Sequence, residues 1–230
     1  MKRYRVAIVG ATGLVGQEFI KVLEQRDFPM ESVSLFASDR SAGKKMFVAH
    51  QEIEVKETTA ESFNGIDIAL FSAGIEVSRY FAPIAAHHGA VVIDNSAAFR
   101  MTPSVPLVVP EVNPEDIKWH KGIIANPNCS TIQMVMALYP LHKVNPIKRI
   151  VVSTYQSVSG TGAAAMEELT TQSRQVLDGQ NTAPHVYPHQ IAHNLLPEIG
   201  SFKDDGYTSE EWKIAAETRK IMHEPDLPLS

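Results

Sequence analysis

Short apolar runs alternate with helical patterns through the first half of the chain. The runs are rich in β-branched residues and predict buried strands over residues 4–9, 33–37, 66–72 and 90–94. Apolar residues at helical spacing predict a helix from the first glycines to about residue 24, and another over 77–87. Strands that alternate with helices in this way indicate βαβ units and an α/β fold with a parallel, doubly wound Rossmann-type sheet.

The pattern changes in the second half, where a proline-rich connection leads to a short run and then to a new group of elements. Thr208-Ser209-Glu210-Glu211 resembles a capping box and predicts the start of a helix that ends near His223. The other predicted elements are a run over 122–125, a helix over 132–141, a longer strand over 147–155, a helix over 163–176 and turns over 178–188. Residues 225–230 look like the approach to a further strand, so we expect the chain to stop within a fold.

The composition is that of a soluble globular protein, with 230 residues of which 44% are hydrophobic and 20% charged. The net charge of −5 and the lack of a basic block argue against a nucleic-acid or membrane surface. No segment approaches the roughly 20 apolar residues of a membrane span, and the apolar start is broken by glycines, unlike a signal peptide. A single cysteine fits a reducing compartment, so we expect the protein in the cytoplasm.

A glycine loop follows the first predicted strand and opens the first predicted helix. Its sequence, Gly10-Ala11-Thr12-Gly13-Leu14-Val15-Gly16, has the spacing G-x-x-G-x-x-G. Glycines at this place allow a tight turn and a close approach of the backbone to a pyrophosphate, which then rests on the helix N-terminus. We interpret the loop as a dinucleotide site; a turn needed only for helix–strand packing is the alternative.

The end of the second predicted strand bears on which dinucleotide is bound. Arg40, with Ser38 and Ser41 as hydroxyl donors and Lys44 nearby, favours the 2′-phosphate of NADP. Asp39 leaves NAD open, because an acidic side chain at this place binds the ribose 2′-hydroxyl of NAD.

Cys129, the only cysteine, lies where a strand-like run meets a helix-like run, in Asn126-Pro127-Asn128-Cys129-Ser130-Thr131. A thiolate at a helix N-terminus is stabilised by free backbone N–H groups and by the helix dipole. Cys129 is therefore a candidate covalent nucleophile, with inert packing as the alternative.

Together these motifs carry a family resemblance. The glycine loop and the Cys129 motif, followed in order by Tyr155–Gly160, Pro188–Ala192 and Glu217–Lys220, resemble aspartate-semialdehyde dehydrogenase. The resemblance implies NADPH-dependent reduction of aspartyl 4-phosphate to aspartate 4-semialdehyde and phosphate, on the route to lysine, threonine and methionine, in a homodimer or homotetramer. The change of pattern along the chain places a domain boundary near residue 127. We therefore expect an NADP-binding domain over residues 1–127 and an α+β catalytic and dimerisation domain over 128–230, incomplete at its C-terminus.

The resemblance assigns roles to individual residues. Cys129 corresponds to the nucleophile that forms an acyl-thioester, and Gln156 to the residue that orients the substrate. Arg100 and Lys220 correspond to phosphate-binding positions, Asn128 lies in the same anion pocket, and Glu217 matches an acid that contacts the substrate. The cofactor positions are Gly10, Thr12, Gly13, Leu14, Val15, Ser38, Arg40, Ser41, Ser159 and Gly160.

The family pattern continues for on the order of a hundred further residues, with a catalytic histidine in a His-Ser-Glu-like motif and an arginine for the substrate carboxylate. Neither motif occurs in this sequence, and His223 does not match. We therefore expect the 230 residues alone to bind cofactor at most and to have negligible activity.

Two other functions stay open. N-acetyl-glutamyl-phosphate reductase shares the chemistry, but its cysteine motif reads more like Asn-Pro-Gly-Cys-Tyr; a non-catalytic NADP-binding remnant is the second alternative. His185, His189 and His193 are spaced four apart, but Pro184 and Pro188 interrupt a continuous helix and the chemistry needs no metal, so we expect none.

Overall fold

The structure is a computed structural model that describes residues 2–230. It divides into two compact units. The first extends to Ile150 and also includes Lys213–Leu229, and the second comprises Val151–Trp212 with Ser230. Among the described residues, no helix is both long enough and apolar enough to cross a membrane.

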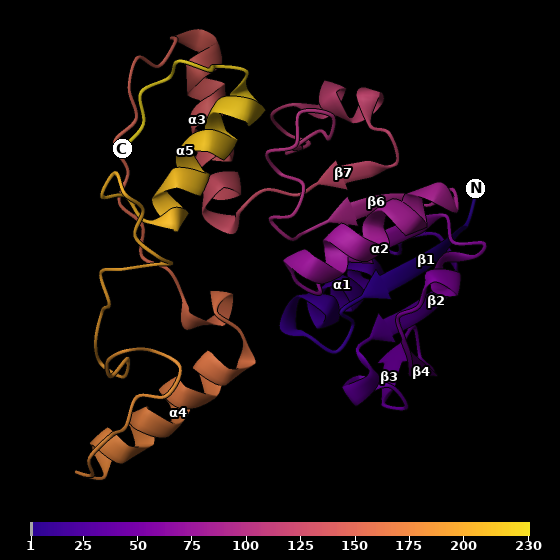
Figure 1. Cartoon of the computed structure of the whole chain (residues 1–230), viewed down its shortest axis with the longest axis horizontal. Helices are drawn as coiled ribbons and strands as arrows, with labels where there is room; N and C mark the ends of the chain where they lie inside the picture. The colour runs from indigo at the N-terminus through magenta and orange to yellow at the C-terminus, as the bar shows by residue number, and fades with distance from the viewer. Residues whose placement is uncertain (1) are drawn as a thin grey trace. The chain divides into compact units, whose positions relative to one another are not determined.

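The first unit is built on a seven-stranded sheet with the order β3-β4-β2-β1-β5-β6-β7 (Figure 1). All neighbouring strands pair in parallel except β3 and β4, which form an antiparallel hairpin at one edge. The strands are β1 (Tyr4–Val9), β2 (Met30–Ala37), β3 (Lys45–Val48), β4 (Gln51–Glu57), β5 (Ile68–Phe71), β6 (Val91–Asp94) and β7 (Ile123–Ala125). The parallel strands confirm the predicted doubly wound α/β fold.

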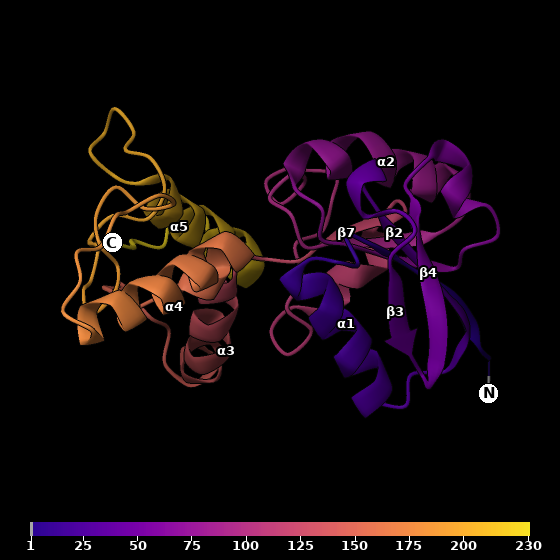
Figure 2. The same cartoon turned by 90° about the horizontal axis from the view of Figure 1, so that it is seen from below.

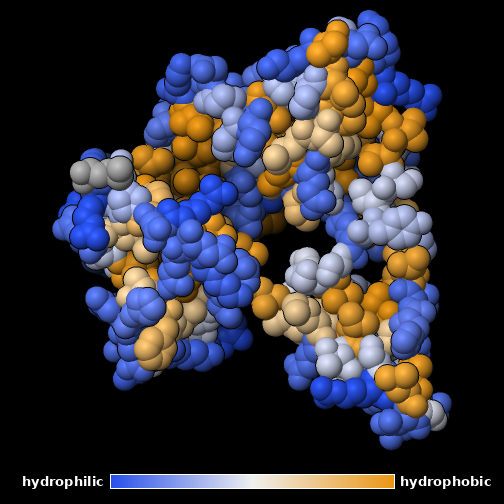
Figure 3. Space-filling view, turned by 180° about the vertical axis from the view of Figure 1, so that it is seen from behind, coloured by the Kyte–Doolittle hydropathy of each residue, from blue (hydrophilic) through white to orange (hydrophobic). Residues whose placement is uncertain are grey.

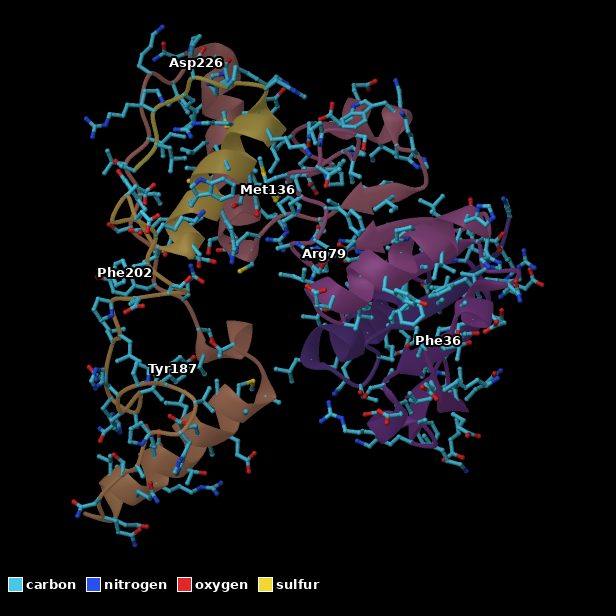
Figure 4. All side chains as sticks on the ribbon, viewed as in Figure 1. Phe36, Arg79, Met136, Tyr187, Phe202 and Asp226 are labelled. Carbon is cyan, nitrogen blue, oxygen red and sulfur yellow. The ribbon has the colours of Figure 1, made fainter. Side chains whose placement is uncertain are left out.

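Helices cover both faces of this sheet. Figure 2 shows α1 (Leu14–Gln25) and α2 (Ile75–His87) on opposite sides of the strands. Successive residues of β1 point to opposite faces. Accordingly, Val6 and Ile8 belong to the core on the α1 side and Ala7 and Val9 to the core on the α2 side. Phe36 of β2, labelled in Figure 4, belongs to the α2-side core.

Two longer helices complete the first unit. They are α3 (Cys129–Val144) and α5 (Ser209–Met222), and the boundary between the units crosses the first turn of α5. Apolar side chains reach the surface around α3 in Figure 3, where Met136, Leu141 and Val144 are exposed. The 3₁₀ segments of the chain are η1 (Asp39–Ser41), η2 (Ala60–Phe63), η3 (Pro114–Trp119) and η4 (Val158–Gly160).

The second unit contains α4 (Ala163–Leu177), the segment with η4 that precedes it, the irregular segments that follow it and the first turn of α5. Two buried polar side chains of α4 hold these segments. Glu168 accepts hydrogen bonds from the backbone N–H groups of His185 and Val186, and Gln172 Oε1 accepts from those of Ile191 and Ala192. The Tyr187 hydroxyl, labelled in Figure 4, donates to Thr161 Oγ1 at 2.9 Å.

Most of the predicted elements are present, and the capping box before α5 is formed. The Thr208 N–H donates to Glu211 Oε2 at 2.6 Å, and the Glu211 N–H donates to Thr208 Oγ1 at 3.2 Å. The division of the chain at residue 127 stays a prediction.

Two parts of the secondary-structure prediction were wrong. The hairpin of β3 and β4 was not predicted, because its strands are short and charged. The strand predicted over 147–155 does not form; this segment makes only one parallel bridge, between Ile150 and Leu229. A strand requires a continuous ladder partner, and within residues 2–230 this segment pairs only with the short stretch 228–230. Val151 and Tyr155 are exposed despite their β propensity.

Candidate active site

The glycine loop connects β1 to α1 and is shaped by two close backbone contacts. Gly10 has a φ of +86°, and a Cβ there would lie 2.3 Å from the Ser72 carbonyl oxygen. A Cβ on Gly16 would lie 2.2 Å from the Gly10 carbonyl oxygen. Gly13 is the N-cap of α1, and no side chain caps that helix. The positive end of α1 is therefore open to an anion, which is the arrangement that a pyrophosphate requires.

The residues predicted to choose the dinucleotide lie next to this loop. The Thr12 hydroxyl donates to Ser41 Oγ at 3.4 Å, which places η1 beside the glycine loop. The Asp39 carboxylate accepts the N–H of Arg40 at 2.7 Å. Ser38 and Arg40 are exposed, and the Arg40 guanidinium has no protein partner among the described residues. Arg40 is therefore available to an anionic ligand.

Cys129 is the first residue of α3, as its motif predicts, and its side chain is exposed. The preceding residue, Asn128, is the N-cap, and its Oδ1 accepts the N–H of Ser130 at 2.9 Å. The first turn of α3 contains no acidic residue. The thiol thus lies at the positive end of a helix and is open to a substrate.

A buried ion pair connects this helix start to Arg100. Glu217 of α5 is 1% exposed, and its Oε1 accepts Arg100 Nη1 at 3.0 Å. Its Oε2 accepts the backbone N–H of Asn128 at 2.7 Å. One carboxylate therefore binds both the predicted phosphate ligand and the residue next to the predicted nucleophile.

The Arg100 guanidinium keeps donors for a ligand. Nε donates to the Asn126 carbonyl at 2.9 Å, and Nη2 donates to the Asn95 carbonyl at 2.9 Å. With the bond to Glu217, three of the five N–H groups are used, so each terminal nitrogen retains one. Two such donors on a planar fork suit bidentate binding of a phosphate.

Lys220, one turn beyond Glu217 on α5, is held differently. Its Nζ donates to the carbonyl oxygens of Arg100, Thr102 and Val105, at 2.7, 2.9 and 2.8 Å. Burial lowers the pKa of Lys220, against the attraction of Asp116 and Glu217. Because an ammonium has three donors, Lys220 can bind an anion directly only by releasing a carbonyl; otherwise it contributes its charge.

The remaining predicted residues belong to the second unit. Gln156 is exposed, and its Nε2 donates to Thr154 Oγ1 at 3.4 Å and to Glu210 Oε1 at 3.5 Å. Ser159 and Gly160 lie in η4, where the Ser157 hydroxyl oxygen accepts the N–H of Ser159. Within residues 2–230, no group of three or more His, Cys, Asp or Glu side chains is placed to hold a metal.

Known proteins resemble this chain over its whole length. The family model for the semialdehyde dehydrogenase NAD-binding domain matches residues 5–120, and that for the semialdehyde dehydrogenase dimerisation domain matches 138–230. An aspartate-semialdehyde dehydrogenase of Aquifex aeolicus is 58% identical, over 99% of this chain and 68% of its own length. The chain belongs to the aspartate-semialdehyde dehydrogenase family.

Solved structures of the family agree with this assignment. Aspartate semialdehyde dehydrogenase II of Vibrio cholerae superposes with a TM-score of 0.97 at 46% identity, covering 100% of this chain and 69% of its own. A family member from Candida albicans, solved with NADP, has a TM-score of 0.72 at 28% identity and covers 96% of this chain and 60% of its own. The chain is therefore an oxidoreductase of a nucleotide-binding family that acts on a semialdehyde.

The family motifs did not reveal how the predicted residues are held in place. Glu217 is buried against Arg100, and three backbone carbonyl oxygens surround the Lys220 ammonium. Asn95 and Asn126 were not assigned roles, although their carbonyls hold Arg100. The available signal was that both directly follow strands of a parallel sheet, at the carboxyl edge where ligands bind.

Proposed function

We propose that this chain carries the site for NADPH-dependent reduction of aspartyl 4-phosphate to aspartate 4-semialdehyde and phosphate. The observation that carries the proposal is the pairing of an exposed thiol at the start of α3 with the partly satisfied guanidinium of Arg100. Glu217 joins the two through the Asn128 N–H. An acyl phosphate requires both a nucleophile and a cationic group for its leaving phosphate.

The residues have the following roles in the proposed mechanism. Cys129 Sγ attacks the acyl carbon of the substrate, the bond from that carbon to the phosphate oxygen breaks, and phosphate leaves on Arg100. The product of this step is an acyl-thioester on Cys129. Backbone N–H groups at the start of α3 stabilise the oxyanion of each tetrahedral intermediate. NADPH, when bound, supplies the hydride that reduces the thioester, after which the C–S bond breaks and Cys129 is released as thiolate.

Other residues bind and orient. Gln156 orients the substrate, and Asn128, Glu217 and Lys220 belong to the same substrate and phosphate pocket. The glycine loop, with Thr12, Leu14 and Val15, binds the pyrophosphate. Ser38, Arg40 and Ser41 bind the 2′-phosphate, and the family resemblance assigns cofactor contacts to Ser159 and Gly160 as well. Three observations support the proposal of NADP over NAD. The guanidinium of Arg40 has no protein partner within residues 2–230, the Asp39 carboxylate already accepts the backbone N–H of Arg40, and the Candida albicans relative was solved with NADP.

We further propose an NADP-binding domain over 1–127, a catalytic and dimerisation domain over 128–230, and a homodimeric or homotetrameric cytoplasmic enzyme. The name of the second family model supports the dimerisation role. The chain spans about two thirds of the length of the curated relatives that it matches. Because the 230 residues contain no His-Ser-Glu motif, the proposal includes negligible turnover by these residues alone.

Phosphate-dependent reduction of NADP by aspartate semialdehyde tests this proposal. We expect the 230-residue chain to turn over roughly 10²- to 10⁴-fold more slowly than the full-length Aquifex aeolicus relative, because the histidine that the family resemblance implies as general base is not among these residues. Binding of NADP, measured by titration calorimetry, is expected to persist. Turnover close to that of the relative would contradict the proposed inactivity. If NADP binds but Cys129→Ser has no effect on the residual rate, the chain is a non-catalytic binding module.

A further inference from the structure

Two asparagines that follow neighbouring strands hold the Arg100 guanidinium from two sides. The carbonyl oxygen of Asn95, which comes directly after β6, accepts Nη2, and that of Asn126, which comes directly after β7, accepts Nε. Each bond is 2.9 Å long. Together with the Glu217 carboxylate on Nη1, these two carbonyls fix the plane of the guanidinium.

The side chains of the same asparagines are bonded to each other. Asn126 Nδ2 donates to Asn95 Oδ1 at 2.6 Å. Their backbones are also anchored in the sheet, since the Asn95 N–H donates to the Phe71 carbonyl and the Asn126 N–H to the Asp94 carbonyl. The strand ladder ends just before them, with Asp94 paired to Ala125. Beyond that point, the side-chain bond continues the link between the two chain segments.

These two segments carry the two halves of the proposed site. Arg100 lies five residues beyond Asn95, and Cys129 lies three residues beyond Asn126. We propose that Asn95 and Asn126 are positioning residues, whose side-chain hydrogen bond fixes the Arg100 guanidinium relative to Cys129. This inference rests on the proposed function, in which Arg100 binds the phosphate that Cys129 displaces. Neither asparagine side chain needs to touch the substrate.

The physical effect of breaking the bond follows from the geometry. Without it, the two carbonyls are held only by the backbone bonds to the sheet behind them. The Arg100 fork then gains orientations in which its remaining N–H groups no longer point at the phosphate. Small displacements of a positioning group are costly because the bound geometry must be near the reactive one. A neutral hydrogen bond of this kind is worth about a three- to ten-fold effect.

Alkylation of Cys129 by two reagents of similar size provides the test. Iodoacetate is anionic and is attracted by a guanidinium near the thiol, whereas iodoacetamide is neutral. The ratio of the two rates cancels any change in thiol exposure or in overall stability, and so reports where the positive charge lies. The variants are Asn95→Ala, Asn126→Ala and the double variant, with Arg100→Gln as the reference and the exposed Asn64→Ala as the matched control.

We expect each single variant to lower the iodoacetate preference about three- to ten-fold, and the double variant to lower it no further, since both singles remove the same bond between the two asparagine side chains. Asn126→Ala also removes a long 3.4 Å bond to the adjacent Pro127 carbonyl, which does not involve Asn95. Asn64→Ala is expected to match wild type. Additive losses in the double variant, or an unchanged ratio in the singles, would overturn the positioning role. If wild type itself has no iodoacetate preference that Arg100→Gln removes, the proposed anion site fails instead. Circular dichroism monitors folding, and serine, which is too short to span the gap, replaces alanine wherever alanine does not fold.

Discussion

At the scale of single residues, two arginines with similar predicted tasks have opposite surroundings. Arg100 is buried, and three of its donors are bound by protein groups, so its orientation is fixed before a ligand arrives. Arg40 is exposed, and its guanidinium has no protein partner among residues 2–230. Binding at Arg40 therefore costs side-chain entropy, which limits its contribution.

Arg40 allows a test of cofactor choice. We expect Arg40→Ala to weaken NADP binding about ten-fold, the value of a charge-assisted hydrogen bond, and to leave NAD binding unchanged. Titration calorimetry with both nucleotides measures this, and Arg3→Ala, another exposed arginine, serves as the control. An equal loss for NAD and NADP would show that Arg40 does not contact the 2′-phosphate.

At the scale of elements, the connection from β1 to α1 depends on the absence of a side chain at Gly10. Gly10 and Gly89 both have positive φ, +86° and +91°, but a Cβ at Gly89 would meet nothing within 4 Å. We expect Gly89→Ala to lower the free energy of unfolding by about 1 kcal/mol, from backbone strain alone. Gly10→Ala is expected to cost about 2–4 kcal/mol, because overlap with Ser72 is added. Denaturant unfolding measures both, and equal losses would contradict the close contact.

The Glu168 carboxylate of α4 binds the backbone of the segment after the helix, and its contribution to stability is expected to depend on pH. Burial by itself raises the pKa of Glu168, but the N–H groups of Val186, His185 and Tyr187 outweigh it, so the pKa is lowered from 4.5. A carboxyl with a lowered pKa stabilises the fold above its ordinary range, and this contribution disappears as the pH falls through its folded-state pKa.

We therefore expect Glu168→Gln to lower the free energy of unfolding by about 1–2 kcal/mol at pH 7. The difference from wild type should shrink as the pH falls from 4.5 through the lowered folded-state pKa of Glu168, below which the wild-type carboxyl is uncharged like the amide that replaces it. The neighbouring and exposed Glu167→Gln is the matched control. A difference that is constant with pH would rule out the charged form as the stabilising species.

The elements show what the sequence could and could not predict. β1 was predicted with its observed bounds, because a buried parallel strand is an uninterrupted apolar run that ends at a glycine. The 147–155 segment has the same β-branched character, but strand formation depends on a partner that local pattern cannot show. At the site, Cys129 was identifiable because a helix start and a family motif coincide. The three carbonyl acceptors of Lys220 could not be predicted, because every residue has a backbone carbonyl and the sequence does not show which ones a side chain will contact.

At the scale of the whole molecule, the chain covers 68% of the length of its Aquifex aeolicus relative, yet it contains the groups proposed for phosphate displacement. Cys129, Arg100, Glu217 and Lys220 all belong to the first unit. The two halves of the proposed reaction are therefore expected to separate in this chain. Nucleophilic attack and departure of phosphate use these groups, whereas full turnover requires a general base as well.

Acyl transfer from aspartyl 4-phosphate to the chain in the absence of NADPH tests the central claim most directly. Intact-mass measurement followed by peptide mapping locates and counts the acyl groups. Because the thioester cannot be reduced without hydride, we expect one aspartyl group to accumulate on Cys129. We expect none in Cys129→Ser, and slower acylation in Arg100→Gln. An unmodified Cys129, or equal labelling of the wild-type and Cys129→Ser chains, would contradict the account.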